Sequence, residues 1–136
     1  MKDLKYLFAY TVPISVYISF INTGIWTYSA VFYVFLLIPL LDFLFGETEE
    51  NLSNNDASYQ NKKWIFDIML YFNVPIIFGL LYVIFSLFQV NNYNTFETIG
   101  LALSTGILLA TNGINVAHEF GHRKPYFERL LSKLLY

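Results

Sequence analysis

Four long apolar stretches dominate the 136-residue sequence and restrict the folds that are open to it. They cover residues 4–21, 28–45, 64–88 and 96–117. Each is close to the ~20 residues that an α-helix needs to cross a lipid bilayer. Because unpaired backbone amides are costly in lipid, only helices and closed barrels span it. The stretches therefore predict an all-α fold, a polytopic transmembrane helix bundle with about four transmembrane helices.

The composition supports a membrane location for the whole chain. Hydrophobic residues make up 56% of the sequence and charged residues only 13%, against about 45–50% and about 25% in soluble proteins. A soluble chain of this length has too small a core to bury so much apolar surface. We therefore expect residues 1–136 to form a single transmembrane domain in contact with the lipid bilayer.

Charge and cysteine content exclude several functions. The net charge of −2 predicts no nucleic-acid partner. The absence of cysteine excludes thiolate catalysis and Cys-ligated zinc. The first apolar stretch follows two lysines, as in a secretory signal, but no small-x-small cleavage site follows it. We interpret it as a retained span.

The positions of lysine and arginine predict the topology. These residues occur near the N-terminus, before the third stretch and after the fourth, whereas the connectors 22–27 and 89–95 carry no charge. Cytoplasmic loops are enriched in lysine and arginine. The pattern therefore predicts that both termini are cytoplasmic. We expect Arg123, Lys124, Arg129 and Lys133 to serve this topology and to contact lipid headgroups.

The two histidines of the chain, His118 and His122, follow the last apolar stretch. A spacing of four places two side chains on one helix face, one turn apart, where both imidazoles can bind one metal ion. The plainer alternative is a pair of ordinary interfacial side chains. Glu119 points about 100° away from His118 on a helix of 3.6 residues per turn. It is therefore a better candidate for contacting a ligand than for binding the metal.

Two chemistries use the pattern His-Glu-x-x-His. In zinc proteases the histidines hold zinc and the glutamate, here Glu119, is the general base. In non-haem iron oxygenases, histidine pairs supply nitrogen ligands and leave positions open for dioxygen. These five residues fit both chemistries.

Several polar residues near the same end of the predicted bundle have two interpretations. Asn112 and Asn115 lie close to the histidines; we favour interhelical hydrogen bonds inside the bundle over a direct role in the site. Asp42 and Glu47 flank the end of the second stretch. They suit either a role near the metal, including proton transfer, or interfacial ion pairs with Lys62, Lys63 or Arg123.

Three further residues have structural interpretations. Gly46 suits helix termination, because glycine accepts the left-handed conformation. Asp67 lies near the start of the third stretch, where the helix dipole favours an acid. Gly121 allows a close approach of another helix or backbone.

The surroundings of the histidines resemble a known family. Residues 115–124 read NVAHEFGHRK and residues 127–131 read FERLL. Together they resemble the first histidine box of the integral-membrane alkane hydroxylases (alkane 1-monooxygenases), within the fatty acid desaturase and hydroxylase superfamily. Residues 39–47, PLLDFLFGE, are similar to the family's segment at the end of the second span.

This resemblance implies an oxidoreductase of the bacterial inner or plasma membrane. It implies a non-haem di-iron monooxygenase that hydroxylates alkanes or related alkyl chains with O2. Electrons would come from a rubredoxin or ferredoxin-type donor. The matching motif implies that His118 and His122 are iron ligands, with Glu119 beside them.

The same resemblance covers only the N-terminal part of such an enzyme. Family members continue with further histidine boxes. We therefore expect an N-terminal fragment that is inactive alone, with a di-iron centre completed by histidines absent from this chain. The alternatives are a membrane zinc metalloprotease of the HExxH type and an inactive membrane fragment.

Overall fold

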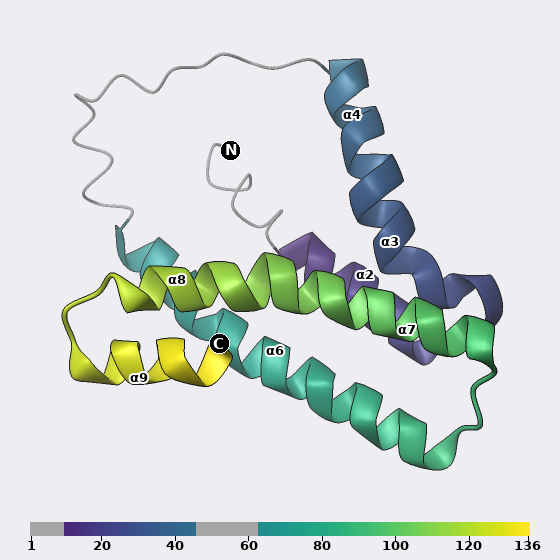
Figure 1. The fold of residues 1–136 in the computed structure, drawn as a ribbon. Coiled ribbons are helices and arrows are strands. Elements are labelled where there is room, and N and C mark those ends of the chain that lie inside the picture. Colours follow the sequence, from purple (N-terminus) through teal and green to yellow (C-terminus); the bar gives the residue numbers. More distant parts are fainter. Residues whose placement is uncertain (1–9, 46–62) are drawn as a thin grey trace.

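The computed structural model describes residues 10–45 and 63–136, and every regular element in these residues is a helix (Figure 1). This confirms the all-α prediction. Two π-helical turns, η3 and η4, interrupt longer helices. The elements are α2 (Thr11–Ile21), the 3-10 helix η2 (Gly24–Tyr28), α3 (Ser29–Phe32), η3 (Tyr33–Leu37), α4 (Ile38–Phe45), α6 (Lys63–Val90), α7 (Thr95–Leu108), η4 (Leu109–Ile114), α8 (Asn115–Gly121) and α9 (Tyr126–Leu135).

Three continuous helical runs are long and apolar enough to cross a membrane. They are Gly24–Phe45, Phe66–Val90 and Thr95–Gly121, and they match the predicted spans 28–45, 64–88 and 96–117. The predicted first span, 4–21, is described only in part: Thr11–Ile21 forms a shorter apolar helix, and residues 4–9 lie outside the described residues. The chain is an integral membrane protein with a polytopic helix bundle.

The bundle core lies between α2, α6 and α7. Val16 and Phe20 of α2 meet Ile77 of α6 and Leu101 and Leu108 of α7 in one buried cluster. In contrast, α4 projects away from α7 and α8 (Figure 1), and none of its residues is buried. Its largest side chains, such as Phe43 and Phe45, are exposed. Such an all-round apolar helix is typical of a surface that faces lipid.

One close helix contact depends on small residues in α7. Ser104 Oγ donates a hydrogen bond of 2.8 Å to the carbonyl oxygen of Thr27. One turn earlier, a Cβ added at Gly100 would overlap the Thr27 side chain and lie 2.6 Å from the Tyr28 ring. Small residues let membrane helices approach closely.

A hydrogen-bonded cap joins the two uncharged connectors. Asn94 and Glu97 form a capping box at the start of α7. Glu97 Oε1 also accepts a 2.7 Å hydrogen bond from the backbone N–H of Gly24, which has a φ of +62°. One carboxylate therefore fixes the start of α7 and the turn before η2.

We expect Glu97→Ala to lower the free energy of unfolding by about 1–2 kcal/mol, because it removes the cap and leaves the Gly24 N–H without its acceptor. Glu97→Gln keeps one acceptor oxygen for the two backbone N–H groups of Gly24 and Asn94 that Glu97 serves, so it should lose less stability than Glu97→Ala. The measurement is reversible unfolding in mixed micelles, followed by circular dichroism. Equal unfolding midpoints for Glu97→Ala and the unmodified chain would contradict the prediction.

Candidate metal centre

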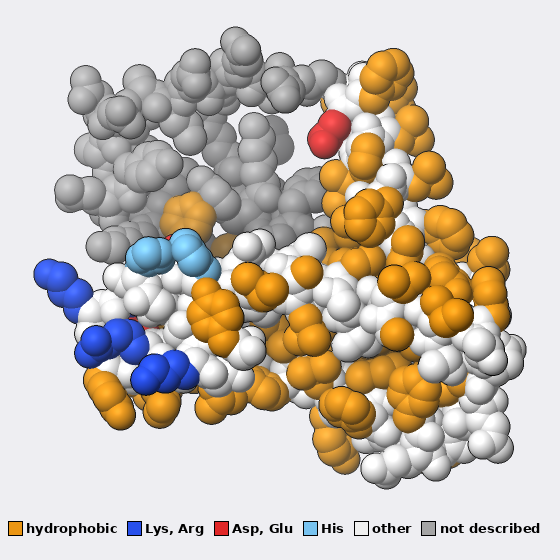
Figure 2. Space-filling view, viewed as in Figure 1, with side chains coloured by type: hydrophobic (Ala, Val, Ile, Leu, Met, Phe, Trp, Pro, Cys, Tyr) orange, Lys and Arg blue, Asp and Glu red, His pale blue; other side chains and the backbone are white. Residues whose placement is uncertain are grey.

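The histidines lie on the outer face of α8, at the end of the longest apolar run. Val116, Ala117 and Phe120 are buried against the bundle. The intervening positions point outward, so His118 and His122 are exposed. Figure 2 shows them side by side on the surface, in pale blue. The 3.6-residue period thus puts the buried residues on one side of this short helix and the histidines on the exposed side.

The two imidazoles converge. His118 Nε2 and His122 Nε2 are 3.1 Å apart, and the ring centroids are 4.4 Å apart. Two nitrogens at this separation can both lie about 2.1 Å from one ion, the usual histidine–metal distance, with an angle at the ion of about 95°. The separation therefore lets both nitrogens bind one metal ion. It is also the distance of a hydrogen bond between the two rings.

A π-helical turn, η4, immediately precedes this face. Such turns are rare and occur frequently at functional sites. Asn112 in η4 is buried, and its Nδ2 donates a 2.8 Å hydrogen bond to Asn73 Oδ1 of α6. The predicted interhelical bond is confirmed for Asn112. It is wrong for Asn115, which is exposed and donates to the carbonyl oxygen of Thr111 in its own helix.

Arg123 follows the histidine pair and binds three carboxylates. Its Nη2 lies 2.5 Å from Asp67 Oδ1, its Nη1 3.4 Å from Glu128 Oε1, and its Nε 3.7 Å from Glu119 Oε1. Arg123 is mostly buried and Glu119 mostly exposed. Arg123 therefore does more than the topological and headgroup role that the sequence indicated. Lys124, Arg129 and Lys133 are exposed, and their role in topology stays a prediction.

The charge around Arg123 keeps it protonated. Burial alone would lower the pKa of the Arg123 guanidinium, but the hydrogen bond and charge of Asp67 and the charge of Glu128 outweigh this effect, so its pKa is raised. A permanently charged guanidinium can hold two carboxylates at once through its fixed fork of donors.

Helix α9 completes this end of the bundle, and the sequence interpretation missed its contribution. Glu128 is buried and accepts a hydrogen bond from the Tyr71 hydroxyl of α6. Ser132, one turn later, packs against α8: a Cβ added at Gly121 would lie 3.2 Å from its Oγ. This bears out the close approach expected at Gly121. The available signal was the period of α9, which places Glu128, Ser132 and Leu135 on one face.

The structure does not bring Asp42 to the histidines. Asp42 is exposed on α4, which projects away from α8 (Figure 1). Gly46, Glu47 and Lys62 lie outside the described residues. The helix-dipole interpretation of Asp67 is wrong, because α6 begins at Lys63 and has no acidic residue in its first turn; Asp67 instead pairs with Arg123. Within residues 10–45 and 63–136, no group of three or more His, Cys, Asp or Glu side chains is placed to hold a metal ion.

Sequence comparison finds relatives of one kind. The chain is 33% identical over 101 residues to an alkane 1-monooxygenase of Pseudomonas putida. The aligned region covers 73% of this chain and 24% of the relative. It is 32% identical over 101 residues to alkane 1-monooxygenase 1 of Alcanivorax borkumensis, with the same coverage. With an alkane 1-monooxygenase of Ectopseudomonas oleovorans it shares 32% identity over 124 residues, or 82% of this chain and 30% of the relative.

The chain thus spans between about a quarter and a third of the length of these curated relatives. No protein-family model matches the sequence. No solved structure matches it either.

Proposed function

Because this chain is homologous to the alkane 1-monooxygenases over most of its own length, we propose that it forms part of a membrane non-haem di-iron monooxygenase. The proposed reaction is the hydroxylation of alkanes or related alkyl chains with O2. The observation that carries the proposal is the convergence of His118 and His122, whose Nε2 atoms are 3.1 Å apart on the exposed face of α8.

In the proposed enzyme, His118 and His122 are two of the iron ligands. Iron, when bound, supplies oxygen activation. Neutral imidazoles bind a metal through a ring nitrogen, and the converging Nε2 atoms suit that role. The remaining ligands would come from histidines outside this chain. We assign no metal-binding role to Glu119, which lies beside Arg123.

An apolar groove elsewhere in the bundle suits a hydrocarbon substrate, although no residue of α8 lines it. An open groove of about 550 Å³ lies between α2 and α6, and its lining is almost entirely apolar. Apolar concave surfaces of this size are typical of sites for hydrophobic small molecules. We propose that both termini face the cytoplasm of a bacterial inner membrane. A rubredoxin or ferredoxin-type protein would then deliver electrons on the side of the histidines.

The test is the iron content of the complete enzyme, in which this chain is joined by the part that supplies the remaining histidines, purified anaerobically in lipid nanodiscs and measured by elemental analysis. We expect His118→Ala and His122→Ala each to lower the iron content sharply, since each removes one ligand. Asn115→Ala, an exposed change one turn away on the same helix, should leave it intact. Equal iron content in the unmodified enzyme and both histidine variants would refute the ligand assignment.

A variant of Glu119 tests the protease alternative. In a zinc protease Glu119 is the general base, and Glu119→Gln would abolish peptide hydrolysis. In the proposed oxygenase, Glu119→Gln retains Fe(II) binding. Proteolytic activity that depends on Glu119 would overturn the proposal.

A further inference from the structure

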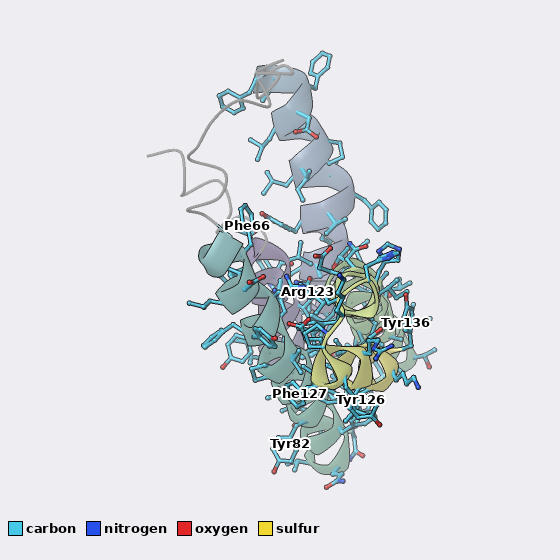
Figure 3. The ribbon with its side chains drawn as sticks, turned by 90° about the vertical axis from the view of Figure 1, so that its left-hand side faces the viewer. Phe66, Tyr82, Arg123, Tyr126, Phe127 and Tyr136 are labelled. Carbon is cyan, nitrogen blue, oxygen red and sulfur yellow. The ribbon has the colours of Figure 1, made fainter. Side chains whose placement is uncertain are left out.

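Arg123 lies where three helices meet. It belongs to the turn between α8 and α9, and it contacts Asp67 of α6 and Glu128 of α9. Figure 3 shows Arg123 between α6 and the α8–α9 hairpin. The contact with Asp67 joins positions that are 56 residues apart in the sequence. One side chain thus links the histidine-bearing helix to two neighbours.

The surrounding contacts explain why this link is specific. Glu128 is buried, and it receives a hydrogen bond from Tyr71 as well as the charge of Arg123. A buried carboxylate is costly unless it is paired and hydrogen-bonded. Removing Arg123 would leave Glu128 with the Tyr71 hydroxyl alone and Asp67 without its cation. The described contacts offer no second basic residue to either acid.

The histidines are placed where helix ends normally fray. His122 is the C-cap of α8, one residue beyond Gly121, and its N–H lies 3.3 Å from the His118 carbonyl oxygen. Terminal turns are among the least stable parts of a helix. Besides the close approach of Gly121 to Ser132, two side-chain contacts to α6 hold this turn: the Phe120 ring packs on Tyr71 with centroids 5.3 Å apart, and Arg123 binds Asp67. They lie at the positions two before and one after His122.

We propose that Arg123 is a positioning residue for the His118–His122 pair. Its guanidinium bridges Asp67 and Glu128, which fixes the turn after His122 and holds the two imidazoles at a separation that suits one metal ion. The inference rests on the proposed function for the metal-binding part. The link between the helices stands on the ion pairs themselves.

The first readout is metal binding. Co(II) is the probe, because its visible absorption reports both affinity and ligand geometry, and the protein is the full chain in nanodiscs. We expect Arg123→Gln to weaken Co(II) binding about tenfold or more, the usual effect of losing a residue that orients metal ligands. Arg123→Lys should recover part of the loss, since lysine can bind Asp67 but lacks the fork that reaches Glu128 as well. Lys124→Gln, an exposed neighbour, should bind as the unmodified chain does.

The second readout is the distance between α9 and α6. The chain has no cysteine, so a pair of spin labels can be placed on the exposed positions Phe72 and Leu134. Double electron–electron resonance should give one narrow distance for the unmodified chain. Arg123→Gln should broaden the distribution, and Lys124→Gln should not.

The outcomes separate the two proposals. Weaker Co(II) binding together with a broadened distance in Arg123→Gln supports the positioning role. An unchanged distance, or unchanged Co(II) affinity and spectrum in that variant, overturns it. If the unmodified chain binds no Co(II) through its histidines, the positioning role fails, while the iron content of the complete enzyme still decides the proposed function and the distance measurement still decides whether Arg123 links the helices.

Discussion

Gly100→Ala is expected to destabilise the bundle, although it adds a single methyl group to a membrane helix. The new Cβ would overlap the Thr27 hydroxyl and lie 2.6 Å from the Tyr28 ring. Overpacking of this kind costs about 1–3 kcal/mol. The loss would fall on the contact between α7 and η2, which lies at the end of the bundle opposite the histidines.

Neither neighbour of Gly100 can move aside easily. Thr27 is fully buried, and its hydroxyl donates to the carbonyl oxygen of Gly24 at 2.8 Å. The Tyr28 hydroxyl donates to the carbonyl oxygen of Phe96 at 2.9 Å, and its ring packs on the Phe96 ring with centroids 4.8 Å apart. The methyl group would therefore separate the two elements.

Gly106→Ala is the matched control in the same helix. A Cβ added at Gly106 meets nothing within 4 Å, and alanine favours a helix over glycine by about 1 kcal/mol. The two substitutions should shift the unfolding midpoint in opposite directions, measured by circular dichroism in mixed micelles. A Gly100→Ala variant as stable as Gly106→Ala would contradict the packing described for Gly100.

The features that sequence could predict are those set by local spacing. Length and hydropathy predicted four spans, and three of them match helices long enough to cross a membrane. The four-residue interval predicted that His118 and His122 share a face, because helix geometry alone determines it. Glycine at position 121 predicted a close approach, which the structure shows against Ser132.

The features that sequence could not predict depend on contacts between distant segments. Asp67, Glu119 and Glu128 all bind Arg123, but Asp67 is 56 residues away and nothing in its own neighbourhood identifies its partner. The position of Asn115 was mispredicted for a different reason. The π-helical turn η4 widens the helix just before it, so two asparagines three residues apart do not share the face that an α-helix would give them.

The buried asparagine pair gives the last expected result. Asn112→Leu should lower the free energy of unfolding by about 1–2 kcal/mol, because Asn73 Oδ1 loses the donor that lies 2.8 Å away and becomes an unsatisfied buried acceptor. Asn73→Leu should have a similar effect, since it removes the acceptor of Asn112 Nδ2. The exposed Asn115 serves as control, and Asn115→Leu should change stability by less than about 0.5 kcal/mol.

The double variant tests whether the pair acts as a unit. With leucine at both positions no buried amide is left without a partner, so the loss should be smaller than the sum of the two single losses, with a coupling of about 1 kcal/mol. Strict additivity would show that the two amides do not depend on each other. Because Asn112 lies in the π-helical turn that leads into α8, the coupling would also give the free energy of one contact between α6 and the start of the helix that carries His118 and His122.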